Sequence, residues 1–190
     1  GFSAKGPEPG NASQYYSLTR LETSGALRVG GTAYAVAGLS WMDHEWSTSA
    51  LAADQVGWDW FSIQLDDGCE LMVFQLRKED GSADPFSSGT FVAADGGARA
   101  LDRDAFAIRV RDTWRSPHTG AIYPSAWTVA VPDMDLELEV RPLLADQELT
   151  LSYAYWEGAV RAEGRREGRA VGGHGYVELT GYAGSMEGQF

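Results

Sequence analysis

The segment GWDWFSIQLDDGCELMVFQLR, residues 57–77, constrains the fold more than any other part of the sequence. Two runs in which residues of different polarity alternate flank Asp66-Asp67-Gly68. A glycine in such a turn can adopt a positive φ angle that other residues disfavour. The pattern therefore predicts a β-hairpin made of two long antiparallel strands.

Similar turn-forming residues recur along the whole chain and extend this prediction. Turn signals lie at short intervals, and the runs between them have the period of two that is typical of strands rather than the apolar stripe of a helix. We expect about nine to eleven strands, in an all-β antiparallel barrel or barrel-like sandwich with few or no helices. A barrel of this kind can enclose a small apolar ligand. The expected strands cover residues 15–21, 32–40, 56–65, 69–77, 106–111, 127–131, 136–141, 149–160 and 175–182.

Composition excludes several function classes. The 190 residues include 15 Lys and Arg against 27 Asp and Glu, a net charge of −12, so the surface repels nucleic acids and anionic lipids. Cys69 is the only cysteine, which excludes an internal disulfide and a cysteine-rich zinc cluster. No run approaches the ~18 apolar residues of a transmembrane segment. We therefore expect neither a nucleic-acid partner nor a membrane span.

The first residues, GFSAKGPEPG, begin without methionine and are rich in glycine and proline. They lack the apolar stretch of a signal peptide. We expect residues 1–13 to be a linker from an upstream domain of a longer parent chain, and residues 14–190 to form a single β-barrel domain.

The stretch GLSWMDHEWS, residues 38–47, combines large aromatic side chains with titratable groups. In a strand, alternation places Trp41, Asp43 and Glu45 on one face and Met42, His44 and Trp46 on the other. If the first face points into an apolar interior, desolvation raises the pKa of its carboxyl groups and makes a proton donor available near neutral pH. The alternative is that this face is solvated and that Met42 and Trp46 supply the core.

Alternation in the 57–77 hairpin separates a second set of candidates. Trp58 and Trp60 share one face of the first strand, whereas Asp59 lies on the other. In the second strand Gln75 and Arg77 follow apolar residues on the same face, as at the polar mouth of a ligand chamber. The alternative is an ion pair between Arg77 and Asp59 at the rim, with the tryptophans packed in the core.

Two glutamates lie among apolar neighbours near the C-terminus, Glu157 in YWEGAV and Glu178 in GYVELTGY. Glutamate in a strand usually faces solvent, and an inward-facing one needs hydrogen-bond partners. The three histidines are scattered, so the sequence gives no metal site. The sequence also lacks G-x-S-x-G, the usual signature of a serine hydrolase.

Several strings, in this order, resemble the C-terminal half of the AttH-like family of lipocalin-like proteins, which is related to the carotenoid 1,2-hydratases. They are KGPEPGNASQYYSLTRL, GLSWMDHEWS, GWDWFSIQLDDG, ELMVFQLR, SSGT, YPSAW, DQEL, YWEGAV and GYVELTGY. The resemblance implies a lipocalin-like or calycin-like β-barrel preceded by a similar upstream barrel. It also implies a periplasmic or secreted location and association with an ABC transporter, although the chain itself carries no export signal.

The carotenoid hydratases carry a His-x-Trp pair and a Tyr-x-Asp pair. By spacing, the second pair corresponds to Trp41-Met42-Asp43, which retains the aspartate. The first corresponds to Gln14-Tyr15-Tyr16, in which both residues of the pair differ. The resemblance thus implies a retained acid with changed partners, which argues against strict carotenoid hydration.

The first functional hypothesis is acid-catalysed hydration or cyclisation of an isoprenoid-like or polyketide-like molecule without metal or organic cofactor. Asp43 is then the acid and Glu45 or Gln14 holds water, while aromatic faces stabilise the cation. The alternatives are a non-catalytic lipid or pigment carrier beside an export system and, from the family label alone, a hydrolase. The residues expected to bind the hydrophobic ligand are Tyr16, Trp41, His44, Trp46, Trp58, Trp60, Gln75, Arg77, Trp156, Glu157 and Glu178.

Overall fold

The computed structural model describes residues 1–184 except residues 48–50 and 53. Apart from two short 3-10 helices, η1 (Arg103–Ala105) and η2 (Pro132–Met134), the regular elements in this part of the chain are strands. No helix there is long and apolar enough to cross a membrane. The strands are β1 (Phe2–Ala4), β2 (Ala12–Val29), β3 (Thr32–Ser47), β4 (Gln55–Leu65), β5 (Glu70–Lys78), β6 (Ser88–Val92), β7 (Ala98–Leu101), β8 (Ala107–Arg115), β9 (Ile122–Val131), β10 (Leu136–Pro142), β11 (Glu148–Thr150), β12 (Ala154–Arg166) and β13 (Arg169–Leu179).

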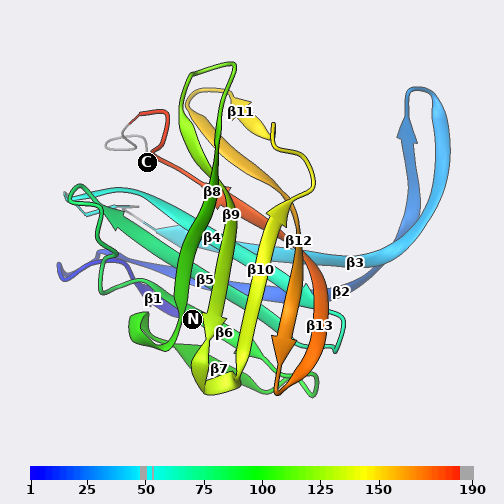
Figure 1. The fold of residues 1–190 in the computed structure, drawn as a ribbon, viewed down its shortest axis with the longest axis horizontal. Coiled ribbons are helices and arrows are strands. Elements are labelled where there is room, and N and C mark those ends of the chain that lie inside the picture. The colour runs from blue at the N-terminus through cyan, green and yellow to red at the C-terminus, as the bar shows by residue number, and fades with distance from the viewer. Residues whose placement is uncertain (48–50, 53, 185–190) are drawn as a thin grey trace.

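The strands form two antiparallel sheets, which confirms the all-β prediction. The larger has the order β7-β6-β5-β4-β13-β12-β10-β9-β8, with β11 added to β12, and the smaller has the order β1-β2-β3. The larger sheet curls so that β8, β9 and β10 cross β4 and β5 at a steep angle (Figure 1). Its terminal strands β7 and β8 are not paired with each other, so it is a half-barrel rather than the closed barrel that was one of the expectations.

The predicted hairpin is β4–β5, and its turn contains Gly68 at φ 87°. Alternation gives each of these strands two different faces. Phe61 and Ile63 of β4, with Leu71 and Val73 of β5, are fully buried in the core enclosed by the curled sheet. Apolar side chains on the opposite faces of β4 and β5 belong to a second apolar cluster beneath β2 and β3. Its members include Met72, Phe74, Leu76, Trp58, Trp60, Tyr15 and Trp41.

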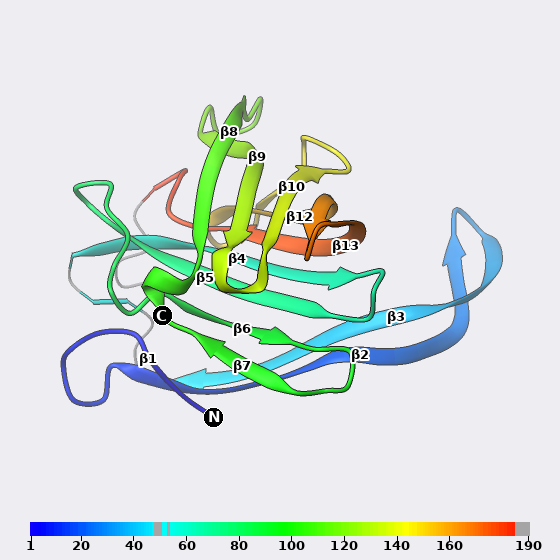
Figure 2. The same cartoon turned by 60° about the horizontal axis from the view of Figure 1, so that its bottom comes forward.

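The strands β2 and β3 form a long ribbon, only part of which lies against the larger sheet. Their far end projects beyond the other strands (Figures 1 and 2). Residues 22–39 of this projection, called the arm below, are all exposed. The other end of the ribbon packs on the outer face of β4 and β5, so residues 40–42 are partly buried.

The N-terminal segment is folded against the ribbon. Residues 2–4 form β1, which pairs with β2. Lys5 is buried, and its backbone carbonyl accepts a hydrogen bond from the Gln55 side chain at 2.8 Å. Backbone hydrogen bonds thus fold residues 1–5 onto β2, and the assignment of residues 1–13 as a linker from an upstream domain stays a prediction.

Candidate functional site

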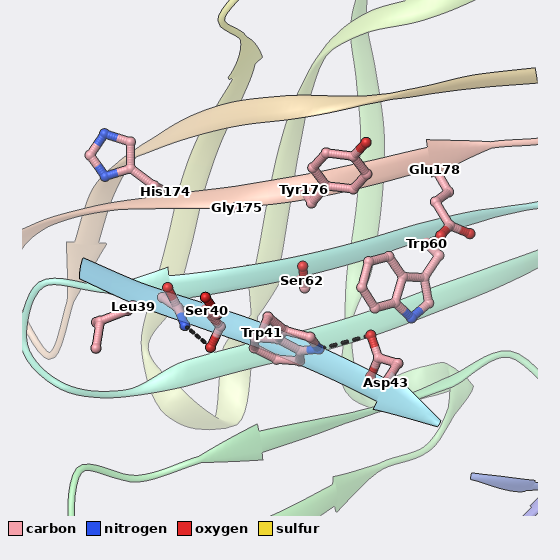
Figure 3. Close-up of a pocket in the computed structure, with 11 residues that line it drawn as sticks. Leu39, Ser40, Trp41, Asp43, Trp60, Ser62, His174, Gly175, Tyr176 and Glu178 are labelled. Atoms are coloured by element: carbon pink, nitrogen blue, oxygen red, sulfur yellow. Dashed lines mark hydrogen bonds between the residues drawn. The ribbon is translucent and has the colours of Figure 1, made fainter. Parts of the chain in front are cut away.

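A pocket of about 500 Å³ lies between β3 of the ribbon and the outer faces of β4 and β13. It is therefore outside the packed core of the half-barrel, whereas the sequence suggested a ligand inside a barrel. Figure 3 shows that its side chains come from all three strands. The lining residues are Leu39, Ser40, Trp41, Asp43, Trp60, Ser62, Gln64, His174, Gly175, Tyr176 and Glu178.

A bulge in β2 lies beside this pocket. Leu18 pairs with Met42 and Leu21 with Ser40, so two residues of β2 lie opposite Trp41 alone. Such a bulge bends the strand and changes the direction of its side chains. Here the side chain of Arg20 reaches the larger sheet and donates to Glu70. The bulge thus helps to fasten the ribbon at the point where Trp41 enters the pocket.

The other wall depends on close packing of β13 against β4. Gly175 lies opposite Ile63, and a Cβ atom at this position would lie 2.1 Å from the backbone oxygen of Ser62. Glycine is therefore required for the two backbones to approach this closely. Alternation along β13 then directs Tyr176 and Glu178 to the pocket side and Val177 into the core.

Asp43 is exposed at the pocket wall and receives three hydrogen bonds. Tyr15 Oη and Trp41 Nε1 each donate to its carboxylate at 2.9 Å, and Ser17 Oγ donates as well. An ionised carboxylate only accepts hydrogen bonds, and this arrangement satisfies one. Asp43 thus accepts hydrogen bonds at an exposed position, whereas a desolvated interior position was one of the expectations. Tyr15, which the sequence analysis did not select, is its partner in the ribbon.

Glu178 has the surroundings that were expected for Asp43. It lies between Trp60 of β4 and Glu157 of β12, each directly opposite in the sheet. Burial raises the pKa of Glu178 to about 7, the negative charge of Glu157 adds to this rise, and a hydrogen bond from Trp58 Nε1 at 3.3 Å opposes it. Glu178 can therefore hold a proton near neutral pH, which makes it the candidate acid of the pocket.

Two tyrosines extend this acidic region along the same face. Glu157 lies close enough to Tyr155 and Tyr176 to influence the pKa of both hydroxyl groups. Burial first, and the nearby glutamate charges second, raise the pKa of both tyrosines, that of Tyr155 to about 12. Both hydroxyl groups therefore remain protonated donors at any physiological pH.

The predicted alternation of residues 41–46 is confirmed, but it separates residues that the sequence analysis had grouped in one site. Gln14, Tyr16, His44 and Trp46 lie on the outer face of the ribbon, where Tyr16 and His44 pack edge to face at 5.3 Å. This face points away from Asp43. Gln14 therefore cannot hold a water molecule for Asp43, and Tyr16 cannot share a cation with Trp41.

Other predicted ligand residues have structural partners. Arg77 forms an ion pair with the buried Asp59 at 3.0 Å, which is the alternative stated for this pair. Gln75 lies on the same side of β5 as Arg77, away from the pocket, because alternate side chains share a face. Trp156 is 1% exposed in the core and donates to the backbone oxygen of Ala145 at 2.8 Å.

Glu45 shares the face of Asp43 but not the pocket. It accepts a hydrogen bond from Ser13 and forms an ion pair with Lys5 at 3.2 Å. Burial lowers the pKa of Lys5 and the Glu45 charge opposes that effect. Among the described residues no group of three or more His, Cys, Asp or Glu is arranged to hold a metal ion.

Comparison with known proteins agrees with this architecture. The AttH-like family model matches residues 1–182. The chain belongs to the AttH-like family. An AttH protein of Nitrosomonas europaea, solved by crystallography, is 41% identical and superposes with a TM-score of 0.86 over 96% of this chain and 56% of its own. This likeness confirms the lipocalin-like fold class expected from the sequence.

Two further relatives of this AttH-like chain carry names from hydration chemistry. A dehydratase, asqC of Emericella nidulans, is 25% identical over 178 residues, which cover 88% of this chain and 50% of the dehydratase. Kievitone hydratase of Nectria haematococca is 20% identical and shares the fold, with a TM-score of 0.72 over 88% of this chain and 52% of its own. The chain thus spans about half the length of the relatives that it matches.

Proposed function

We propose that this AttH-like protein adds water to, or removes it from, a carbon–carbon double bond in an apolar small molecule. The observation that carries the proposal is a pair of carboxyl groups in different surroundings at one aromatic pocket. Burial raises the pKa of Glu178 to about 7, whereas Asp43 is exposed and accepts hydrogen bonds from Tyr15 and Trp41. The names of the dehydratase and hydratase relatives support the same class of reaction.

The reaction needs one acid, one base and a wall that tolerates positive charge. Glu178 donates its proton to one alkene carbon, and the π electrons form the new C–H bond, which leaves a cation on the neighbouring carbon. Water attacks this cation through an oxygen lone pair, and Asp43 accepts the proton that the water loses. Proton exchange with solvent restores both carboxyl groups. Dehydration is the same path in reverse.

The aromatic walls suit the cationic intermediate. The rings of Trp41 and Trp60 lie 6.4 Å apart at 85°, so they present surfaces in two directions. The electron-rich face of tryptophan attracts positive charge. A pocket of about 500 Å³ is in the range that accepts molecules of drug size, such as an isoprenoid or polyketide fragment.

Turnover in isotopically labelled water tests this proposal. A panel of isoprenoid and polyketide-like alkenes and their alcohols is incubated with the protein, and products are analysed by mass spectrometry for label incorporation or loss of water. We expect turnover that falls by about 10²–10⁴-fold in Glu178→Gln, because the amide keeps the shape of the side chain but supplies no acidic proton. Undiminished turnover in Glu178→Gln would rule out this assignment of the acid.

A non-catalytic carrier is the second candidate, and the openness of the pocket to solvent beside the exposed Asp43 favours it. A carrier binds the same class of apolar ligand without changing it. Tryptophan fluorescence reports binding in both cases, since Trp41 and Trp60 line the pocket. Binding without label incorporation for any bound compound would support the carrier.

We also propose that an upstream half of a longer parent chain covers the arm. The arm exposes Leu27, Val29, Tyr34, Val36 and Leu39, and an isolated two-stranded ribbon is marginally stable in water. The relatives are about twice as long as the matched region. Hydrogen exchange of residues 22–39 should be slower in a longer parent chain than in this chain, and equal rates would contradict the proposal.

A further inference from the structure

We propose that the pocket selects cationic amines that carry an apolar group, in preference to neutral or anionic molecules of the same shape. This inference rests on the proposed function of the same pocket, because an ammonium group resembles the carbocation of the hydration reaction. It goes further, since it assigns a class of ligand that binds without reacting.

The geometry of the aromatic walls is the first argument. Trp41 and Trp60 meet edge to face, and Figure 3 shows Asp43 and Glu178 at the same end of the row of labelled side chains as Trp60. Trp41 Nε1 and Trp60 Nε1 both donate to polar groups, to Asp43 at 2.9 Å and to Tyr15 Oη at 3.2 Å. These hydrogen bonds fix the orientation of both rings, so an aromatic wall is in place before a ligand arrives.

The charge around the pocket is the second argument. None of the described residues that line the pocket is Lys or Arg, whereas Asp43 and Glu178 contribute two carboxyl groups to its lining. Glu157 lies directly opposite Glu178 in the sheet and adds a third carboxyl group on the same face. A cation therefore meets favourable charge on two sides of the pocket, and an anion meets repulsion.

Basic side chains around the pocket are paired with carboxylates. Arg20, at the bulge beside the pocket, donates to Glu70. Lys5 pairs with Glu45 at 3.2 Å, and its ammonium lies 4.0 Å from the centre of the Phe74 ring. Arg161, opposite His174 in the sheet, pairs with Glu163 at 2.8 Å. Each of these three side chains thus has a carboxylate partner already, so none is left to balance an anionic ligand.

Three probes of matched shape test this inference by fluorescence titration or calorimetry. They are benzyltrimethylammonium, neopentylbenzene, in which carbon replaces the charged nitrogen, and phenylmethanesulfonate, which is an anion. We expect the ammonium to bind about tenfold more tightly than neopentylbenzene, an advantage that added salt reduces. We expect the sulfonate to bind more weakly than either.

A charge-removing variant locates the effect. Burial raises the pKa of Glu178 to about 7, so this carboxyl group is ionised at about pH 8. It faces Glu157 on β12, Asp43 on β3 and two indoles on β4. Glu178→Gln should weaken ammonium binding about five- to tenfold and leave neopentylbenzene binding within about twofold. Glu137→Gln, which changes an exposed carboxylate of β10, is the matched control and should change neither.

The outcomes separate this inference from the proposed function. Equal or tighter binding of neopentylbenzene, equal binding of the sulfonate, or no detectable binding of the ammonium would each overturn the cation preference. Water addition to an alkene is measured independently, so it can succeed when the ammonium fails. Tight ammonium binding without turnover of any alkene would instead uphold the inference and argue against the enzyme.

Discussion

The raised pKa of Glu178 predicts that removing its charge stabilises the protein at high pH. Burial, and secondarily the charge of Glu157, moves the pKa from 4.5 to about 7 on folding. The folded state therefore binds this proton more tightly than the unfolded chain does. Stability from the proton is fully present below about pH 4.5 and is lost as the pH rises through about 7.

The magnitude follows from the size of the shift. A change of about 2.5 pKa units at about 1.4 kcal/mol each corresponds to about 3.5 kcal/mol in the free energy of unfolding. Glutamine at position 178 keeps the volume and the hydrogen bond from Trp58 but needs no proton. We therefore expect Glu178→Gln to gain up to about 3.5 kcal/mol over the wild type above about pH 8 and nothing near pH 4.5.

Urea unfolding of both proteins at about pH 5, 6, 7 and 8.5 measures this difference. The difference should grow by about 1.4 kcal/mol per pH unit between the two pKa values and then level off. Glu137→Gln, which removes an exposed carboxylate, controls for the general effect of net charge. A stability difference that stays constant across the pH range would refute the reasoning, because linkage requires it to change with protonation.

Three further predictions concern the surroundings of the pocket. Glu157→Gln removes a negative charge opposite the acid and should move the alkaline limb of the activity profile to lower pH by a few tenths to about one unit; an unmoved limb would contradict this coupling. Arg77→Met leaves Asp59 buried without its ion pair and should cost about 3–5 kcal/mol in urea unfolding, whereas a loss under about 1 kcal/mol would show that the pair is dispensable. Tyr15→Phe removes a donor from Asp43 and should lower kcat about tenfold, while Tyr16→Phe on the outer face should not; equal effects would place both residues outside the site.

Local sequence patterns predicted the elements whose partners are close in sequence. The β4–β5 hairpin was correct because a glycine turn and two alternating runs lie within one segment. The separation of Trp41 and Asp43 from His44 and Trp46 was correct for the same reason. The short strands β6 and β7 were not predicted, because four or five residues give too little alternation to recognise.

The chemical roles could not be predicted from alternation, since it fixes a face but not what covers that face. Asp43 and Glu178 both occupy pocket-facing positions, yet Glu178 is partly buried and Asp43 is exposed, because the sheet surrounds Glu178 while Asp43 lies in a ribbon of two main strands. Arg77 was predicted to bind the ligand because it shares a face of its strand with apolar residues. The same face also brings Arg77 to Asp59, with which it forms an ion pair in the structure.

Asp43 and Glu178 belong to different sheets, so the distance between their carboxyl groups depends on contacts between the two sheets. Strand pairing fixes Glu178 relative to Trp60, but no ladder joins either of them to Asp43. The connection runs through side chains: Trp60 Nε1 donates to Tyr15 Oη at 3.2 Å, and Tyr15 Oη donates to Asp43 at 2.9 Å. Gln64 Nε2 donates to the backbone oxygen of Thr19 at 2.6 Å and fastens the ribbon nearby. Because the core of the half-barrel does not include these contacts, weakening them should alter the separation of acid and base while the fold persists.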